Sequence, residues 1–239
     1  MSRRVVTIES RYNGPPDSGN GGYACGIVAS GISGCATARL FLPPPLDVPL
    51  TLDTDTECEL RAGDSVVAKA WPSALELEVP EPVTLEEADA AAGRYRGFEE
   101  HIFSTCFVCG PNRDPGDGLR IFAGDVGARE LVASPWTPHA ALADEAGVVC
   151  PEFVWAALDC PGAFSFPQVE NRACVLGELT LRRDRDVRAG APHVVTAWYI
   201  GSEGRKHFAG TALFTAAGER CAAAKATWIE TTPVVTAAV

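Results

Sequence analysis

Two separated groups of residues in this chain have the types and spacing to form one chemical site. Asn20-Gly21-Gly22 opens an apolar segment in the first half, and Val149-Cys150-Pro151-Glu152 stands before a similar segment in the second half. Asp159 follows Cys150 by nine residues, whereas the corresponding position of the first segment is Ala29. Each half therefore holds either a glycine-rich helix opening or a carboxylate, and we predict a single site where the halves meet.

The amides of Gly21 and Gly22 could stabilise negative charge. The first N–H groups of a helix have no partner within the helix and, together with the helix dipole, they favour an anion nearby. Aimed at a carbonyl, they would stabilise the oxyanion that forms on attack, and glycine would let a ligand approach the backbone closely. A flexible turn is the alternative for a Gly-Gly pair alone. The repeated helix opening favours the functional interpretation.

Asp159 ends an otherwise apolar stretch, Phe153 to Leu158. A carboxylate in such surroundings is partly buried and has a raised pKa unless it is well hydrogen-bonded. It could deprotonate water or act as a nucleophile that forms a mixed anhydride. The alternative is a cap at a helix end, because Pro161 disfavours a helical conformation at Cys160. We predict that Asp159 is the general base.

The elements that must position these residues recur in the same order in both halves. In the first half, the patterns predict a short strand within Val5–Tyr12, a helix over Gly21–Ile32, and strands at Ala36–Leu42, Pro49–Asp53, Glu57–Arg61 and Ser65–Trp71. In the second half, they predict strands at Leu119–Phe122 and Glu130–Ala133, a helix over Pro151–Cys160, and strands at Cys174–Arg182, Val194–Ile200, His207–Thr215 and Arg220–Glu230. Thr84 and Glu87 form a capping-box pattern, which predicts a connecting helix over Thr84–Arg96.

Residue identities also favour a duplication. Two groups, Leu40-Phe41-Leu42 with Asp47-Val48, recur at one constant offset as Leu179-Thr180-Leu181 with Asp186-Val187, and Lys69-Ala70-Trp71 resembles Lys225-Ala226-Thr227-Trp228. The predicted fold class is α+β, with two units in which an antiparallel sheet wraps around one helix. The units would pair edge to edge into a continuous sheet, which hides exposed strand edges. The predicted divisions are 1–82, a connecting segment 83–100, and 101–239.

Composition excludes several classes of protein. No stretch approaches the roughly 20 apolar residues of a membrane span, and the N-terminus lacks the apolar core of a secretory signal. The nine cysteines follow no framework spacing, which is typical of reduced thiols in a cytoplasmic protein. A net charge of -11 argues against a nucleic-acid partner. We therefore expect a soluble protein with no membrane or nucleic-acid partner.

Cys106 and Cys109 form a single Cys-x-x-Cys pair, which leaves three interpretations open. Zinc commonly takes four ligands from two such pairs; there is no second pair, although Cys150, Cys160, Cys174 and the four scattered histidines could contribute. A redox role is typical of this motif at the start of a helix, whereas here it precedes a predicted strand. We expect structural thiols and neither a metal nor a redox cofactor.

The same segment carries a family resemblance. Cys106-Phe107-Val108-Cys109-Gly110-Pro111-Asn112, followed by Gly118-Leu119-Arg120-Ile121, resembles the opening of hotdog-fold thioesterases of the phenylacetyl-CoA thioesterase type. In that family a His-Gly-Gly turn begins the central helix, and an acidic residue nine positions later, in a Leu-Asp context, activates water. Here Asn20-Gly21-Gly22 stands in place of His-Gly-Gly, and Leu158-Asp159 has the acidic spacing from Cys150. Histidine is absent from both helix openings.

The layout is similar to that of double-hotdog acyl-CoA thioesterases, in which a hotdog dimer is fused into one chain. The resemblance implies hydrolysis of an acyl-CoA by Asp159 facing Gly21 and Gly22, with Asn20 positioning the thioester or the water. It implies no cofactor beyond the coenzyme A of the substrate. The alternatives are a hotdog dehydratase, which usually employs a catalytic histidine, and a non-catalytic acyl-CoA binding or sensor module.

Two further sets of residues are candidates for substrate binding. Tyr23, Phe153 and Trp155 would line an acyl pocket beside the helices. The cluster Arg182, Arg183 and Arg185 could hold the phosphates of coenzyme A, because guanidinium groups pair well with phosphate. A solvated turn interleaved with acidic residues is the equally simple alternative for these arginines. The fused chain could also associate further as a homo-oligomer.

Overall fold

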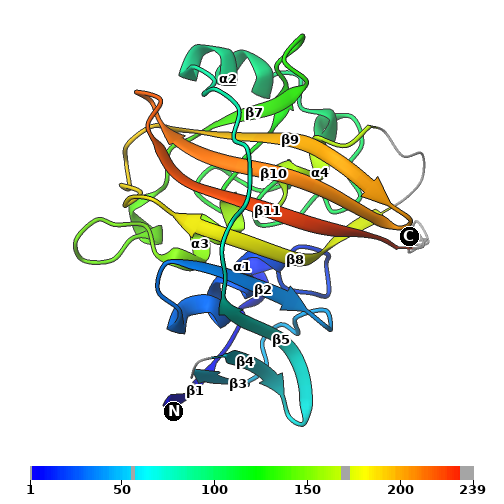
Figure 1. Ribbon diagram of the computed structural model, residues 1–239, viewed down its shortest axis with the longest axis vertical. Helices are drawn as coiled ribbons and strands as arrows, with labels where there is room; N and C mark the ends of the chain where they lie inside the picture. The colour runs from blue at the N-terminus through cyan, green and yellow to red at the C-terminus, as the bar shows by residue number, and fades with distance from the viewer. Residues whose placement is uncertain (1, 55–56, 168–172, 232–239) are drawn as a thin grey trace.

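A continuous antiparallel sheet of eleven strands forms the body of the protein (Figure 1). The computed structural model describes residues 2–54, 57–167 and 173–231. In spatial order the strands are β1 (Ser2–Val6), β3 (Leu50–Thr54), β4 (Cys58–Ala62), β5 (Ser65–Pro72), β2 (Cys35–Leu40), β8 (Ala173–Arg183), β11 (Arg220–Thr231), β10 (Lys206–Thr215), β9 (His193–Glu203), β7 (Leu131–Trp136) and β6 (Gly124–Asp125).

The strand order is mirrored about the pair β2 and β8, the first strands after the two central helices. These strands pair antiparallel, from Cys35 opposite Arg182 to Arg39 opposite Glu178. On one face of this pair, the hydroxyl groups of Thr37 and Thr180 lie 2.7 Å apart. The predicted edge-to-edge pairing of two α+β units into one sheet is thus confirmed.

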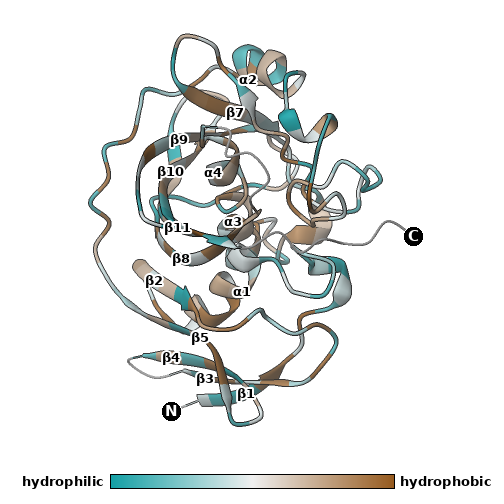
Figure 2. Cartoon of the chain, turned by 90° about the vertical axis from the view of Figure 1, so that its right-hand side faces the viewer, coloured by the Kyte–Doolittle hydropathy of each residue, from teal (hydrophilic) through white to brown (hydrophobic). Residues whose placement is uncertain are grey.

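The central helices α1 (Gly21–Val28) and α3 (Pro151–Ala157) pack against each other on the inner side of the curved sheet (Figure 2). Glycine makes this contact close. A Cβ atom on Gly22 would lie 2.5 Å from Asp159 Cβ, and one on Gly26 would lie 2.5 Å from Glu152 Cα. The start of α1 therefore lies beside the end of α3, and the low helix propensity of glycine is offset by packing that no larger residue permits.

Both central helices end earlier than the sequence predicts. A 3₁₀ turn, Ala29–Gly31, follows α1, and Leu158 caps α3 before the short helix α4 (Pro161–Phe164) begins. Asp159 therefore lies in the link between α3 and α4. Ending α3 here frees the Leu158 carbonyl, which accepts a hydrogen bond of 2.9 Å from Thr211 Oγ1 in β10.

The predicted strand at Leu119–Phe122 is wrong. Arg120 has a positive φ of 53°, which interrupts an extended run. The amides on either side donate to the segment that contains the Cys-x-x-Cys pair, from Leu119 to Phe107 at 2.8 Å and from Ile121 to Val108 at 2.9 Å. This part of the chain therefore supports the cysteine loop, and the strand β6 begins only at Gly124.

The connecting helix α2 (Leu85–Ala92) has the predicted capping box between Thr84 and Glu87 and is shorter than predicted. It packs on β7, where Ala88 and Ala91 share an apolar cluster with Leu131. The chain that leads to α2 crosses the outer face of the sheet in front of β11 (Figure 1). In the described parts of the chain, no helix has the length and apolar character to cross a membrane.

Candidate active site

Asp159 joins the two halves of the chain. Its Oδ2 accepts hydrogen bonds from the backbone amide of Gly22 at 2.8 Å and from Asn20 Nδ2 at 3.0 Å. Asn20 is the N-cap of α1, and its Oδ1 accepts a hydrogen bond of 2.9 Å from the Tyr23 amide. The side chain of Asn20 therefore holds the helix opening with one atom and the carboxylate with the other.

Burial dominates the electrostatics of Asp159. The residue is 2% exposed, and this burial raises the pKa of its carboxyl to about 7, although the bonds from Gly22 and Asn20 lower it. The second oxygen, Oδ1, is buried and has no hydrogen-bond partner among the described residues. One oxygen is therefore fixed, and the other has unused capacity to accept a hydrogen bond, which is unusual for a buried group.

The helix opening is only partly available to a ligand. The Gly22 amide binds Asp159, and the Tyr23 amide binds Asn20. The Gly21 amide is bound by neither side chain. Gly21 also has a packing role, because a Cβ atom there would lie 2.9 Å from Leu176 Cβ in β8. Of the two predicted donors to a carbonyl, only Gly21 is not already bound to Asp159.

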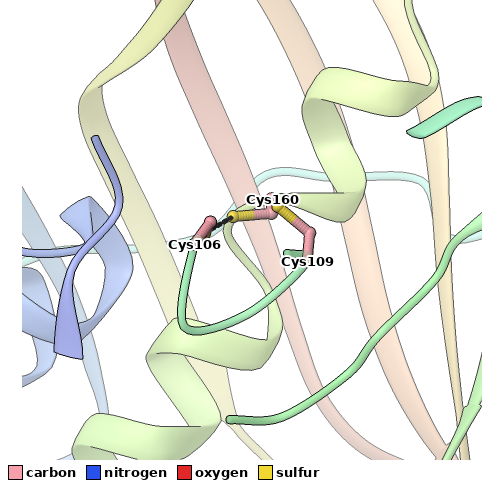
Figure 3. A group of neighbouring side chains, drawn as sticks. All are labelled: Cys106, Cys109 and Cys160. Atoms are coloured by element: carbon pink, nitrogen blue, oxygen red, sulfur yellow. Dashed lines mark hydrogen bonds between the residues drawn. The ribbon is translucent and has the colours of Figure 1, made fainter. Parts of the chain in front are cut away.

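Three buried cysteines, Cys106, Cys109 and Cys160, lie close together, and Cys160 directly follows Asp159 in the chain (Figure 3). The sulfur atoms of Cys106, Cys109 and Cys160 all lie within 4.8 Å of one another, and those of Cys106 and Cys160 are 3.6 Å apart. Asn20 Nδ2 lies 3.6 Å from the Cys160 sulfur. Hydrogen bonds from the Cys109 and Cys160 thiols lower the pKa of Cys106 well below its usual value, against the effect of burial.

The sequence analysis treats Cys106 and Cys109 as a separate pair and names Cys160 only among several distant candidates. No spacing connects Cys160 with a pair more than 50 residues earlier. The one available signal was its position directly after Asp159. The fold places it there because the link after α3 lies against the loop that carries Cys106.

The predicted acyl-pocket residues divide into two groups. Tyr23 stacks on Tyr12 with ring centroids 4.4 Å apart, and Phe153 lies 5.6 Å from Tyr23 in the same cluster. Phe107 joins them, 5.0 Å from Tyr12. The backbone of Trp155 lies instead against the first turn of α1, since its carbonyl would be 2.7 Å from a Cβ atom on Gly22. The sequence analysis did not identify Tyr12 or Phe107 as members of this cluster.

The predicted phosphate-binding arginines lie in ion pairs at the far end of β8. Their partners are carboxylates: Arg182 with Asp184 at 3.0 Å, Arg183 with Asp186 at 3.3 Å, and Arg185 with Glu219 at 2.7 Å. Leu176, which lies against Gly21, precedes Arg182 by six residues of the same strand. At about 3.3 Å per residue this separation is roughly 20 Å. A ligand that reached from Asp159 to these arginines would have to be long.

A hollow of about 490 Å³ opens elsewhere, in front of the loop that leads to α3. It is lined by residues that include Arg120, Trp136 and His139, and it does not include Asp159. The Arg120 guanidinium lies over the Phe122 ring at 5.0 Å and forms no ion pair within the part of the chain that the structure describes. The hollow therefore lies on the second half, apart from Asp159.

Several solved structures resemble this protein over nearly its whole length. The tesB protein MAP1729c of Mycobacterium avium subsp. paratuberculosis matches with a TM-score of 0.63 and 13% identity, covering 96% of this chain and 93% of that chain. For the acyl-CoA thioesterase II TesB2 of Mycobacterium marinum, the TM-score is 0.58 and the identity 11%, over 92% and 93% of the two chains. A hot dog fold protein of unknown function from Alicyclobacillus acidocaldarius matches with a TM-score of 0.60 and 10% identity, covering 97% of this chain and 94% of that chain.

No protein-family model matches the chain, and no curated protein matches it in sequence. At identities this low, the structural similarity speaks for the fold. The mirrored sheet, the two inner helices and the full-length matches agree with one another. The chain has a double-hotdog fold, with the layout found in TesB-type acyl-CoA thioesterase II structures.

Proposed function

We propose that this protein hydrolyses an acyl-CoA thioester at Asp159. One observation carries the proposal: the carboxylate of the second half is held by the helix opening of the first half, and its buried Oδ1 has no hydrogen-bond partner in the described parts of the chain. A carboxylate in this condition is suited to take a proton from water. The similarity to structures named as acyl-CoA thioesterase II supports the choice of substrate.

The reaction uses the two oxygens of Asp159 differently. Oδ2 stays bound to Gly22 and Asn20, which fixes the plane of the carboxylate. Oδ1 accepts a proton from a water molecule, whose oxygen attacks the thioester carbonyl. The tetrahedral intermediate then releases coenzyme A, and Asp159 returns the proton to the leaving sulfur. The products are a carboxylic acid and free coenzyme A.

The helix opening contributes through Gly21 and Asn20. The Gly21 amide is the candidate donor to the developing oxyanion, because the Gly22 amide is already bound to Asp159. Asn20 acts as a positioning residue for Asp159, whereas the family resemblance implied that it positions the thioester or the water. Tyr23 and Phe153 are the candidates for the acyl-binding surface, together with Tyr12.

The burial of Asp159 favours a second candidate, an acyl-CoA binding module without turnover. Asp159 is 2% exposed, and the loop at Phe107 is tied to the first half by a bond of 2.7 Å from its amide to the Asn13 carbonyl. Access of water and substrate to the buried Oδ1 therefore requires a shift of the segments packed around Asp159. A binding module would retain acyl-CoA and release no free thiol.

The test is the release of free thiol from a panel of short, long and aromatic acyl-CoAs. Asp159→Asn removes the base and preserves the shape of the side chain. Glu152→Gln is the matched control, because Glu152 is a partly buried acidic residue in the first turn of α3, the helix that precedes Asp159. We expect turnover by the wild type and the control, and a loss of about 100-fold or more in Asp159→Asn. Equal rates in all three proteins would exclude Asp159 as the base.

A further inference from the structure

The cluster of Cys106, Cys109 and Cys160 has no role in the proposed hydrolysis. We propose that these three sulfur atoms bind one thiophilic divalent cation of the zinc class, which joins the Cys-x-x-Cys loop to the link after α3. Thiolates are the ligands that zinc prefers in structural sites, and a Cys-x-x-Cys pair commonly supplies two of them. This proposal is independent of the hydrolytic activity.

The distances fit a tetrahedral cation. With metal–sulfur bonds of about 2.3 Å, two ligand sulfurs of a tetrahedral site lie about 3.8 Å apart. The sulfurs of Cys106 and Cys160 are 3.6 Å apart, and the most distant pair of the three lies within 4.8 Å. Figure 3 shows the three side chains converging, two from the loop and one from the helical link. A side-chain adjustment of about 1 Å would bring all three sulfurs to ligand spacing.

The loop is built to hold the two sulfurs of its pair in place. The Gly110 amide donates to the Cys106 carbonyl at 2.9 Å, which closes a tight turn around the pair. Any side chain at residue 110 would break this turn, because a Cβ atom there would lie 2.6 Å from the Cys106 amide nitrogen. Tyr95 Oη donates to the Cys109 carbonyl at 2.9 Å from the other side. A loop fixed in this way has less conformational freedom to lose when it binds a metal.

The fourth coordination position of the cation would be filled by a ligand from outside the chain. Within the described ranges, the cluster that could hold a cation comprises only these three cysteines. His101 is the nearest histidine in sequence, and its Nε2 is buried. Its Nδ1, however, accepts a hydrogen bond of 3.0 Å from the Phe103 amide, so Nε2 carries the proton and cannot coordinate in this arrangement. Three protein ligands with a water molecule or small anion in the fourth position is an established zinc arrangement.

The first experiment measures the metal content of the full chain, purified without a histidine tag and without chelators. We expect about one zinc ion per chain. Cys109→Ser and Cys160→Ser should each weaken zinc binding by at least about tenfold in competition with a chromogenic chelator, since each removes a ligand. Cys35→Ser is the matched control, because Cys35 is half-buried in β2 and outside the cluster, and it should bind zinc like the wild type.

The wild type alone also decides the question, so a variant that fails to fold does not obscure the result. Replacement of zinc by cobalt should give thiolate-to-metal charge-transfer absorption, which the three cysteines alone would not produce. The proposal is overturned if the reduced wild type binds neither zinc nor cobalt with all nine thiols free to alkylate after denaturation. A disulfide between Cys106 and Cys160 in protein purified under reducing conditions, found by mass spectrometry, would also overturn it.

Discussion

Asp159 accepts a hydrogen bond of 2.8 Å from the backbone amide of Gly22, across 137 residues of sequence. The contact restricts both positions. A Cβ atom on Gly22 would lie 2.5 Å from Asp159 Cβ and 2.7 Å from the Trp155 carbonyl oxygen. Gly22, which belongs to the Asn20-Gly21-Gly22 helix opening, is therefore also required by the contact between the two halves.

Gly22→Ala should destabilise the fold and disturb Asp159 together. The added methyl group would meet backbone and Cβ atoms, which cannot move away as a flexible side chain could. We expect a loss of about 1–3 kcal/mol in the free energy of unfolding, measured by urea denaturation. Gly93→Ala is the control, because a Cβ atom there would lie 3.6 Å from its nearest neighbour, the Ala90 carbonyl. Equal stability of the two variants would contradict the described packing.

The two roles of Asn20 can be separated by a pair of substitutions. Asn20→Ser keeps a side-chain oxygen that can cap α1, whereas Asn20→Ala removes the cap at a cost of about 1 kcal/mol. Both variants lose the bond from Nδ2 to Asp159. We expect kcat to fall in both with little change in KM, and stability to fall mainly in Asn20→Ala. If Asn20→Ser retained full kcat, Asn20 would be a helix cap alone.

The arginine cluster can be tested with two substrates that share an acyl group. In the variant with Arg182, Arg183 and Arg185 all changed to alanine, KM for an acyl-CoA should rise about tenfold if the cluster holds its phosphates. KM for the matching acyl-pantetheine, which lacks the nucleotide, should not change. Arg188→Ala is the control, because Arg188 donates to the Ala146 carbonyl. An unchanged KM for acyl-CoA would show that the carboxylate partners keep these arginines from the substrate.

His193 should make stability depend on pH. Burial lowers the pKa of this histidine below its ordinary value, although a bond to the Ala191 carbonyl opposes the shift. As pH falls below about 6.5, the unfolded chain takes up a proton that the folded chain resists, so stability decreases, by at most about 1.4 kcal/mol per pH unit. Above this pH the contribution is fully present.

The measurement is urea unfolding at a series of pH values between about 5.5 and 7.5, which spans the titration of an ordinary histidine. His193→Gln keeps a polar side chain of similar length and cannot titrate in this range. As pH falls, the unfolding free energy of the wild type should decrease relative to that of the variant. A difference that stays constant with pH would contradict the prediction.

The sequence alone was sufficient for the architecture. Strand and helix signals are local, because they depend on alternation, turn residues and caps within a few positions of each other. The capping box at Thr84 and the repeated order around the two helices were therefore predictable. The end of α3 and the segment at Leu119–Phe122 were not predictable. A hydroxyl donor in β10 binds the Leu158 carbonyl at the end of α3, and the loop that carries Cys106 and Cys109 binds the amides of Leu119 and Ile121.

Only the tertiary structure decided which chemical groups meet. Asp159 and Gly22 were recognisable as candidates from their types and spacing, but the sequence could not show that the Gly22 amide is already bound to the carboxylate. Nor could the sequence show that Cys160 lies beside Cys106 and Cys109. These contacts depend on how closely and at what angle two helices pack, and that geometry is a property of the whole sheet and its core.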